Sequence, residues 1–131
     1  MNFILSIFLI FLLIRLSYLY KQDVSVSGQL LCNRKRAVGI QIYLKEKDTF
    51  DPDDTLDATI SDFEGKFKLD GVEDEFKSIK PYIEIIHKCE VSNIRCNRST
   101  IYSIDQKEIG RNYDFQYINL NIKGHSDFET C

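Results

Sequence analysis

The stretch KPYIEIIHKCEVSNIRC, Lys80 to Cys96, alternates in polarity from Tyr82 to Cys89 and carries one histidine and two cysteines. The residues of one parity are Ile83, Ile85, His87 and Cys89. Because successive side chains of a strand point to opposite faces of its sheet, this pattern predicts a β-strand with one buried face. The histidine and the cysteines leave three interpretations: a metal site, a catalytic thiol with its base, or a disulfide-bonded strand end.

The N-terminal residues indicate the compartment, and the compartment decides how cysteines are interpreted. An apolar run extends from Phe3 to Ile14 and stops at the first charged residue. A membrane-spanning helix needs about 20 apolar residues, so this run is too short to span a bilayer comfortably and is typical of a secretory signal peptide. We therefore predict a signal peptide over residues 1–20, with cleavage between Ser17 and Gln22; an uncleaved signal anchor is the alternative.

Removal of this leader leaves one small domain, residues 21–131, that is mildly acidic. One of the 17 Lys and Arg residues, Arg15, lies in the leader, which leaves 16 basic residues against 20 acidic ones and a net charge near −4. Such a surface, without a Lys/Arg block, argues against nucleic acid as a partner and against a polybasic membrane contact. We expect no nucleic-acid partner, and no stable membrane span once the leader is removed.

All four cysteines lie in this domain, at Cys32, Cys89, Cys96 and Cys131. An even number in a small secreted domain predicts two disulfides, each worth roughly 2–4 kcal/mol to a core of limited size. Asn97-Arg98-Ser99 is an N-glycosylation sequon, so we predict a glycan on Asn97.

Period-two alternation recurs along the domain, and no window after the leader shows a sustained helical period. The predicted strands lie near 24–32, 37–48, 56–60, 66–70, 82–89, 99–104 and 111–124. The inward residues of the first two strands are expected to be Val24, Val26, Leu30, Cys32, Val38, Ile40, Ile42 and Leu44. Short strands at regular spacing predict an all-β fold, a two-sheet antiparallel β-sandwich of about seven strands.

Four segments are expected to connect these strands. Residues 33–36 form an exposed turn, the acidic residues 48–57 a loop, residues 61–65 a hairpin turn, and residues 71–81 a helical or irregular connection. In the last strand Tyr113 and Phe115 have one parity, whereas Ile118, Leu120 and Ile122 have the other. This change predicts a bulge or a strand that is buried on both faces.

The order of several short motifs resembles a known family. The motifs are G-x-L-x-C at Gly28 to Cys32, V-x-I-x-L-x-E near Gly39 to Glu46, S-D-F-E-G-K-F at Ser61 to Phe67, G-x-x-x-E at Gly71 to Glu75, P-Y-x-x-I-x-H-x-C at Pro81 to Cys89, and then Cys96 and Cys131. In order and spacing the mature chain is similar to the nematode transthyretin-like family of secreted proteins. The resemblance implies a transthyretin-type sandwich, a signal peptide and an extracellular location.

The resemblance implies little chemistry. Some members of the family are thought to act as secreted ligand-binding or bridging factors, including toward cell-surface lipid. We therefore expect a secreted, non-enzymatic binding or bridging protein whose partner is an unknown extracellular protein or lipid.

Two alternatives remain. Hydroxyisourate hydrolases of the same fold use His and Arg residues in their strands and a C-terminal Tyr-Arg-Gly-Ser tail, whereas this chain ends HSDFETC and its histidines are His87 and His125. A structural component of an extracellular matrix is the other alternative, and neither repeats nor cross-linking motifs support it.

The residues offer four further candidate sites. His87, Cys89, Cys96 and His125 form a possible zinc set, and a cysteine with a histidine a possible nucleophile pair, but oxidation in a secretory compartment removes the thiolates that both need. The acidic run Asp48, Asp51, Asp53, Asp54 and Asp57 lacks the spacing and glycine of an EF-hand calcium loop. Tyr82, Tyr102, Tyr113 and Tyr117 form a possible binding face. We expect no catalytic residue, no metal and no cofactor.

The expected topology suggests a disulfide pairing. If the strand that ends at Cys89 pairs antiparallel with the second strand, Cys89 lies beside the turn that follows Cys32. Cys96 then begins the return strand at the end where the C-terminal residues also emerge. We therefore predict Cys32–Cys89 and Cys96–Cys131, with Cys89–Cys96 and Cys32–Cys131 as the chief competitor.

Overall fold

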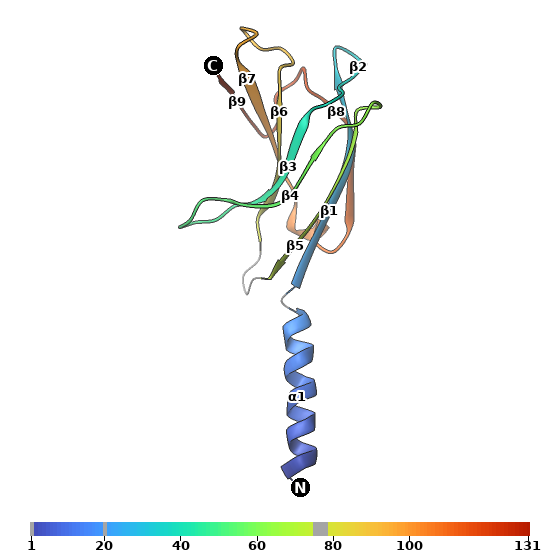
Figure 1. Cartoon of the computed structure of the whole chain (residues 1–131), viewed down its shortest axis with the longest axis vertical. Helices are drawn as coiled ribbons and strands as arrows, with labels where there is room; N and C mark the ends of the chain where they lie inside the picture. Colours follow the sequence, from blue (N-terminus) through green and yellow to red (C-terminus); the bar gives the residue numbers. More distant parts are fainter. Residues whose placement is uncertain (1, 20, 75–78) are drawn as a thin grey trace.

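The computed structural model describes residues 2–19, 21–74 and 79–131, which form a helix and a sandwich of two β-sheets (Figure 1). The helix is α1 (Asn2–Leu19), and a short 3-10 helix covers Gln106–Glu108. The strands are β1 (Lys21–Cys32), β2 (Lys35–Arg36), β3 (Gln41–Glu46), β4 (Asp54–Ile60), β5 (Lys66–Asp74), β6 (Pro81–His87), β7 (Asn97–Ser103), β8 (Asn112–Asn119) and β9 (Ser126–Thr130).

A four-stranded sheet contains β2, β1, β5 and β8, and a five-stranded sheet has the order β4-β3-β6-β7-β9. All strand pairs are antiparallel except β1 with β8, which is parallel. The parallel pair arises because the chain leaves β7, crosses to the other sheet through the 3-10 helix and enters β8 in the direction of β1. The predicted two-sheet sandwich is confirmed, and the parallel pair is an addition to it.

The core lies between the sheets and is built by alternate residues of each strand. In β6 the predicted inward residues Ile83, Ile85 and His87 are all buried, and Val24, Val26 and Leu30 are buried in β1. Fully buried isoleucine and leucine side chains dominate this core, which is where most of the favourable free energy of folding originates.

The predicted start of the second strand, near residue 37, is wrong. Val38 was expected in the core but is 55% exposed, and β3 begins only at Gln41. The hydroxyl of Ser61 donates to the carbonyl of Ala37 (2.7 Å) and accepts from the N–H of Ile40 (2.9 Å). This side chain fixes residues 37–40 as an irregular connection that carries the chain from one sheet to the other.

The turn at residues 61–65 forms, but it does not make a hairpin. One oxygen of Asp62 accepts the N–H groups of Glu64 and Lys66, each at 2.9 Å, and Gly65 has a left-handed φ of 77°. The turn nevertheless joins strands of different sheets, since β4 pairs with β3 and β5 pairs with β1. The prediction of a turn at these residues was therefore correct, and the prediction that its flanking strands pair with each other was wrong.

Two strand boundaries also differ from expectation, and one strand was not expected. The acidic loop, expected over 48–57, is shorter because β4 already begins at Asp54. β5 extends to Asp74, into the segment 71–81 that was expected to be a helical or irregular connection. Residues 75–78 of that segment lie outside the described residues. The C-terminal residues form an unexpected strand, β9, on the edge of β7.

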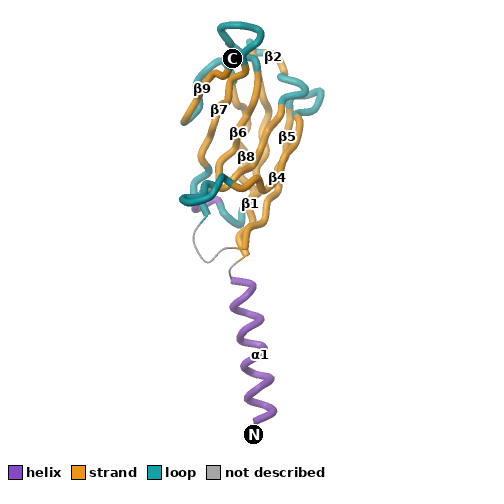
Figure 2. Tube along the Cα trace, turned by 60° about the vertical axis from the view of Figure 1, so that its left-hand side comes forward, coloured by secondary structure: helices purple, strands orange, loops and turns teal. Residues whose placement is uncertain are grey.

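Figure 2 shows α1 extending away from both sheets, from the end of the sandwich where β1 begins. Its apolar side chains between Phe3 and Ile14 are exposed. Within the described residues, no helix combines the length and the apolar character needed to cross a membrane.

Candidate functional site

Figure 1 shows β2 and the C-terminus at the end of the sandwich opposite α1, which we call the distal end. The two disulfides lie at this end, because Cys32 directly precedes the turn to β2 and Cys131 is the C-terminal residue. Cys32 is bonded to Cys89, and Cys96 is bonded to Cys131, which is the pairing that the topology predicts. No described cysteine is free. The first bridge joins the two sheets, and the second joins the start of β7 to the C-terminus.

Three connections meet at the distal end: residues 33–40, residues 88–96 and the first part of residues 120–125, whose last residue, His125, accepts a hydrogen bond from the N–H of Ser103 at the far end of β7. Asn121 links them, because its side-chain oxygen accepts from the N–H of Asn33 (2.7 Å) and its amide nitrogen donates to Asn33 (2.8 Å) and Glu90 (2.9 Å). Lys88 adds hydrogen bonds to the carbonyls of Ile94 and Cys96 at 2.7 and 3.0 Å. Disulfides and hydrogen bonds together hold these connections in one arrangement.

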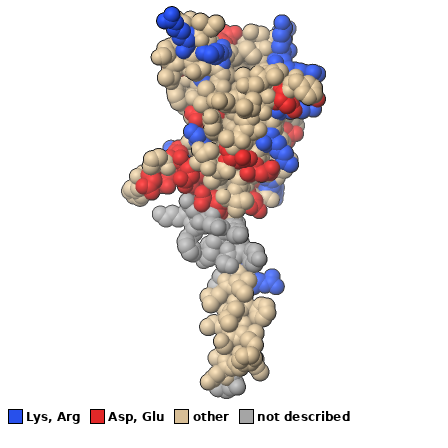
Figure 3. Space-filling view, viewed as in Figure 1, with Lys and Arg blue, Asp and Glu red and all other residues tan. Residues whose placement is uncertain are grey.

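The distal end presents basic and aliphatic side chains to solvent. Figure 3 shows most of the Lys and Arg side chains of the distal connections at this end, together with a few Asp and Glu, whereas more Asp and Glu lie over the lower half of the sandwich in the same view. The exposed acidic residues Asp62, Glu90 and Glu129 also belong to this end. The exposed basic residues of the three connections are Arg34, Lys35, Arg36, Lys88, Arg95 and Lys123. Ile94 and Ile122 are 82% and 60% exposed beside them, and Val38 is also exposed. The acidic net charge and the lack of a long Lys/Arg block argued against a polybasic contact, and this group of basic side chains was not predicted because its residues come from three separate segments.

A buried polar network lies behind this surface, between β6, β7 and β9. The N–H of Cys89 donates to Nδ1 of His87 (3.0 Å), so the ring proton is on Nε2, which donates to Oγ1 of Thr100 (2.7 Å). Thr100 in turn donates to Oδ2 of Asp127 (2.8 Å). Burial, and then the positive charge of Arg98, lower the pKa of His87 to about 4, although Asp127 acts in the opposite direction.

Arg98 and Asp127 form a two-pronged ion pair inside this network. Nε and Nη2 of Arg98 donate to the two carboxylate oxygens at 3.1 and 2.8 Å, and Nη1 donates to the carbonyls of Cys89 and Leu120. Burial raises the pKa of Asp127, but hydrogen bonds from Arg98 and Thr100 outweigh that effect and lower the pKa overall. Sequence reasoning missed this pair, because Arg98 was noticed only as the middle residue of the sequon.

The model of the transthyretin-like family matches residues 27–105, from the middle of β1 to just beyond β7. The chain belongs to the transthyretin-like family. The matched segment contains three of the four cysteines and the Cys32–Cys89 bridge, whereas β8, β9 and Asp127 lie outside it.

Curated relatives agree with this assignment. Transthyretin-like protein 16 of Caenorhabditis elegans is 44% identical over 110 residues, which cover 84% of this chain and 83% of that protein. Transthyretin-like protein 1 of the same nematode is 40% identical over 84 residues, which cover 59% of this chain and 54% of that protein. A 9R-lipoxygenase from Cyanothece matches 76% of this chain with 16% of its own, at a TM-score of 0.54 and 20% identity, and this likeness shows the fold alone.

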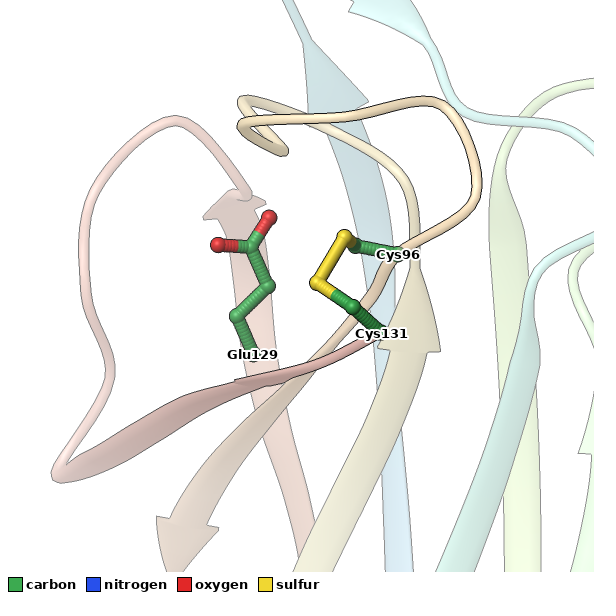
Figure 4. A group of neighbouring side chains, drawn as sticks. All are labelled: Cys96, Glu129 and Cys131. Carbon is green, nitrogen blue, oxygen red and sulfur yellow. A yellow bond between two sulfur atoms is a disulfide. The ribbon is translucent and has the colours of Figure 1, made fainter.

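The zinc and thiol interpretations do not fit the transthyretin-like domain. Cys89 and Cys96 are both in disulfides, so neither can supply a thiolate, and His87 is only 3% exposed with both ring nitrogens hydrogen-bonded. Figure 4 shows Glu129 beside the Cys96–Cys131 disulfide. The carboxylate of Glu129 accepts from the N–H and the hydroxyl of Ser92, at 2.6 and 2.9 Å, and so fixes the β6–β7 connection to β9.

The acidic carboxylates of 48–57 do not converge on one point. Asp53 accepts from the N–H of Asp48 (3.1 Å), and Asp57 accepts from the N–H of Asp70 (2.9 Å), so both cap backbone groups. Asp54 lies instead with Glu46 and Glu73, with carboxylate oxygens of the three within 4.8 Å of one another. Acidic groups of this kind are common on proteins without an ion, and this one supports no metal assignment.

The four tyrosines do not form one face, so that interpretation is wrong. The hydroxyl of Tyr82 donates to Asp53 on the outer side of the five-stranded sheet. Tyr102 and Tyr113 are half-buried and pack against the core. Tyr117 is largely exposed, on the outer side of the other sheet.

Proposed function

We propose that the domain acts outside the cell as a non-enzymatic binding protein, and that the distal end is its binding surface. The observation that carries this proposal is the exposure of aliphatic side chains, Ile94 above all, on connections held by two disulfides. Exposed apolar residues on a rigid support are typical of interaction sites, because the ordering of the loops has already occurred before binding.

An extracellular location is consistent with the chemistry of the chain. Disulfides persist in oxidising compartments, and both bridges link segments of the distal end. The predicted signal peptide over residues 1–20 would bring the domain into that environment. A glycan on Asn97, which is exposed at the first residue of β7, belongs to the same proposal.

The charge of the surface indicates the class of partner. Six exposed basic side chains at the distal end favour a negatively charged cell-surface partner, either an acidic protein or the head groups of anionic lipid. A hydrolase of the hydroxyisourate type gains no support, since His87 is buried and engaged and is not positioned to act on a substrate.

A binding assay with the purified mature domain, its disulfides intact, tests the proposal. We expect saturable binding to cultured cells, and co-sedimentation with vesicles that contain anionic lipid if lipid is the partner. Replacing Ile94 by Ser and Lys123 by Glu should weaken cell binding, because one change removes apolar contact and the other reverses a charge. The control is Phe50→Ser, an exposed apolar residue at the opposite end. Cell binding that is unchanged by both distal substitutions would place the site elsewhere.

A further inference from the structure

The outer side of the four-stranded sheet carries a groove of about 550 Å³ where β8 lies beside β1. Its polar lining consists of Ser27, Gln29, Lys66, Asp114, Gln116 and Tyr117. Residues in register across the sheet form two rows: Tyr117 with Gln29 and Lys66, and Asp114 with Ser27 and Lys68. This size lies within the range of about 300–1,000 Å³ that is usual for small-ligand sites.

A β-bulge in β8 places Tyr117 in this groove. Tyr113 and Phe115 turn toward the core, and the same alternation would carry Tyr117 inward as well. The register shifts between Ser27 and Gln29, and Gln116 adopts a left-handed φ of 63°. Ile118 is therefore buried, and Tyr117 is 68% exposed. Bulges re-aim side chains in this way and are over-represented next to functional sites.

The backbone at the bulge adopts a conformation that costs free energy for a residue other than glycine. The N–H of Gln116 donates to Oδ1 of Asp114 at 2.8 Å, which holds the bulge in place. On the neighbouring strand Gly28 has no space for a Cβ, which would lie 3.0 Å from the ring of Phe67 and 3.2 Å from Phe115. The core below thus supports the floor of the groove and keeps it from collapsing inward.

The groove differs from the rest of the same face in its unused hydrogen-bonding groups. Two residues earlier on β1, the hydroxyl of Ser25 is bonded to Asp70 (2.7 Å) and to Asn112 (3.1 Å). In the groove, the hydroxyls of Ser27 and Tyr117 and the side-chain amide of Gln116 have no partner among the residues that the structure describes. These groups can both donate and accept, and they stand beside an exposed aromatic ring.

The charges in the groove nearly cancel. Lys66 pairs with Glu64 at 3.3 Å, and Asp114, which lines the groove, has one carboxylate oxygen hydrogen-bonded to the backbone of the bulge. A strongly charged ligand would find no matching field there, and a purely apolar ligand would desolvate the free polar groups. A ligand for this groove should therefore be uncharged and should offer hydrogen-bonding groups. A neutral sugar meets both requirements, since its hydroxyls donate and accept and its C–H face stacks on a tyrosine ring.

We propose that this groove is a binding site for a neutral oligosaccharide, with Tyr117 as the stacking platform and Asp114, Gln116 and Ser27 as hydrogen-bonding partners of the sugar hydroxyls. The site is separate from the distal end, so it stands or falls independently of the proposed function. It would give the protein a second contact, with a glycan, on a different face of the same sandwich.

The test is isothermal titration of the mature, disulfide-intact domain with four neutral trisaccharides: cellotriose, chitotriose, maltotriose and mannotriose. We expect saturable binding of at least one of them. Tyr117→Ala should weaken that binding at least tenfold, and Asp114→Asn should weaken it less, because the amide keeps the oxygen that accepts from Gln116. Phe63→Ala is the matched control, since Phe63 is 76% exposed on the turn between β4 and β5, outside the groove.

Unfolding curves of all three variants should match the parent, because each side chain is exposed. Failure of every trisaccharide to bind the folded parent would overturn the proposal. Binding that survives Tyr117→Ala, or that is lost equally in Phe63→Ala, would overturn it as well. Binding of peptides in place of sugars, measured with an unstructured peptide library, would assign the groove to another ligand class and also reject it.

Discussion

At His87, burial and hydrogen bonding both favour the neutral imidazole over the protonated one. The ring accepts one hydrogen bond from the backbone of Cys89 and donates one to Thr100, which is an arrangement that only the neutral imidazole can make. Protonation would place a second N–H against a backbone donor and add a positive charge beside Arg98. The folded protein therefore resists protonation of His87 more than the unfolded chain does.

This resistance predicts a pH dependence of stability. The pKa of His87 is about 4 in the folded state against 6.5 in the unfolded chain, so the unfolded state binds more protons between these values. The free energy of unfolding should fall by about 3 kcal/mol as the pH drops from 7 to 4, and this contribution should level off below 4. Urea unfolding at a series of pH values measures it. His87→Gln should lack the decline, His125→Gln should retain it, and the same decline in both would exclude His87 as its source.

The Arg98–Asp127 pair gives a second prediction for single residues. Arg98→Ala leaves the buried carboxylate of Asp127 without its cation and removes the donors to two carbonyls, so we expect a loss of about 3–5 kcal/mol in unfolding free energy. Lys45→Ala removes a more exposed ion pair, with Glu84 at 2.7 Å, and should cost less than about 1 kcal/mol. Equal costs for the two substitutions would show that burial does not govern the strength of these pairs.

Among the elements, the turn from β4 to β5 depends on one glycine. Gly65 has a left-handed φ, and a Cβ there would lie 2.6 Å from the carbonyl oxygen of Leu30. We expect Gly65→Ala to destabilise the protein by more than about 2 kcal/mol, because strain and a backbone clash add. Gly39 has a similar positive φ, 73°, but open space around the Cβ, so Gly39→Ala should cost only about 1 kcal/mol. Thermal unfolding distinguishes the two, and similar losses would mean that the clash is relieved by movement.

The elements also show what local pattern can predict. Alternation located β1 and β6 because each has one buried face. The parity change in β8 predicted either a bulge or burial on both faces, and the structure has a bulge. Pairing partners were harder to predict, since the turn at 61–65 has the chemistry of a hairpin whether or not its strands share a sheet. The strand β9 was missed because its five residues, SDFET, are mostly exposed and acquire their pairing only from β7.

On the scale of the whole molecule, the Cys96–Cys131 bridge should hold β9 in the sheet. Replacing both cysteines by Ser removes a constraint on a segment with a sequence separation of 35, and we expect a loss of about 2–4 kcal/mol. Amide hydrogen exchange should show reduced protection in β9 and in Asn97 and Arg98 of β7, with little change in β1 and β5. Loss of protection spread evenly over both sheets would contradict a local role for this bridge.

The candidate surface was less predictable than the fold. The disulfide pairing followed from topology, because only strand direction was needed to bring each pair to one end. The basic and aliphatic side chains of the distal end become neighbours only after three connections have converged, and Arg34, Ile94 and Lys123 are far apart in the sequence. The groove on the four-stranded sheet was harder still to predict from the sequence, since the exposure of Tyr117 depends on the exact position of a one-residue bulge.

The uneven distribution of charge along the sandwich, with an excess of basic groups at the distal end and of acidic groups toward the other, gives the molecule an electric dipole in spite of its small net charge (Figure 3). In the field of a negatively charged surface, such a dipole turns the distal end forward and the acidic end away before any contact is made. Encounters would then be pre-oriented, and their rate would fall as added salt screens the field over about 10 Å at 0.1 M ionic strength. Association kinetics, rather than equilibrium affinity, would be the sensitive measure of this asymmetry.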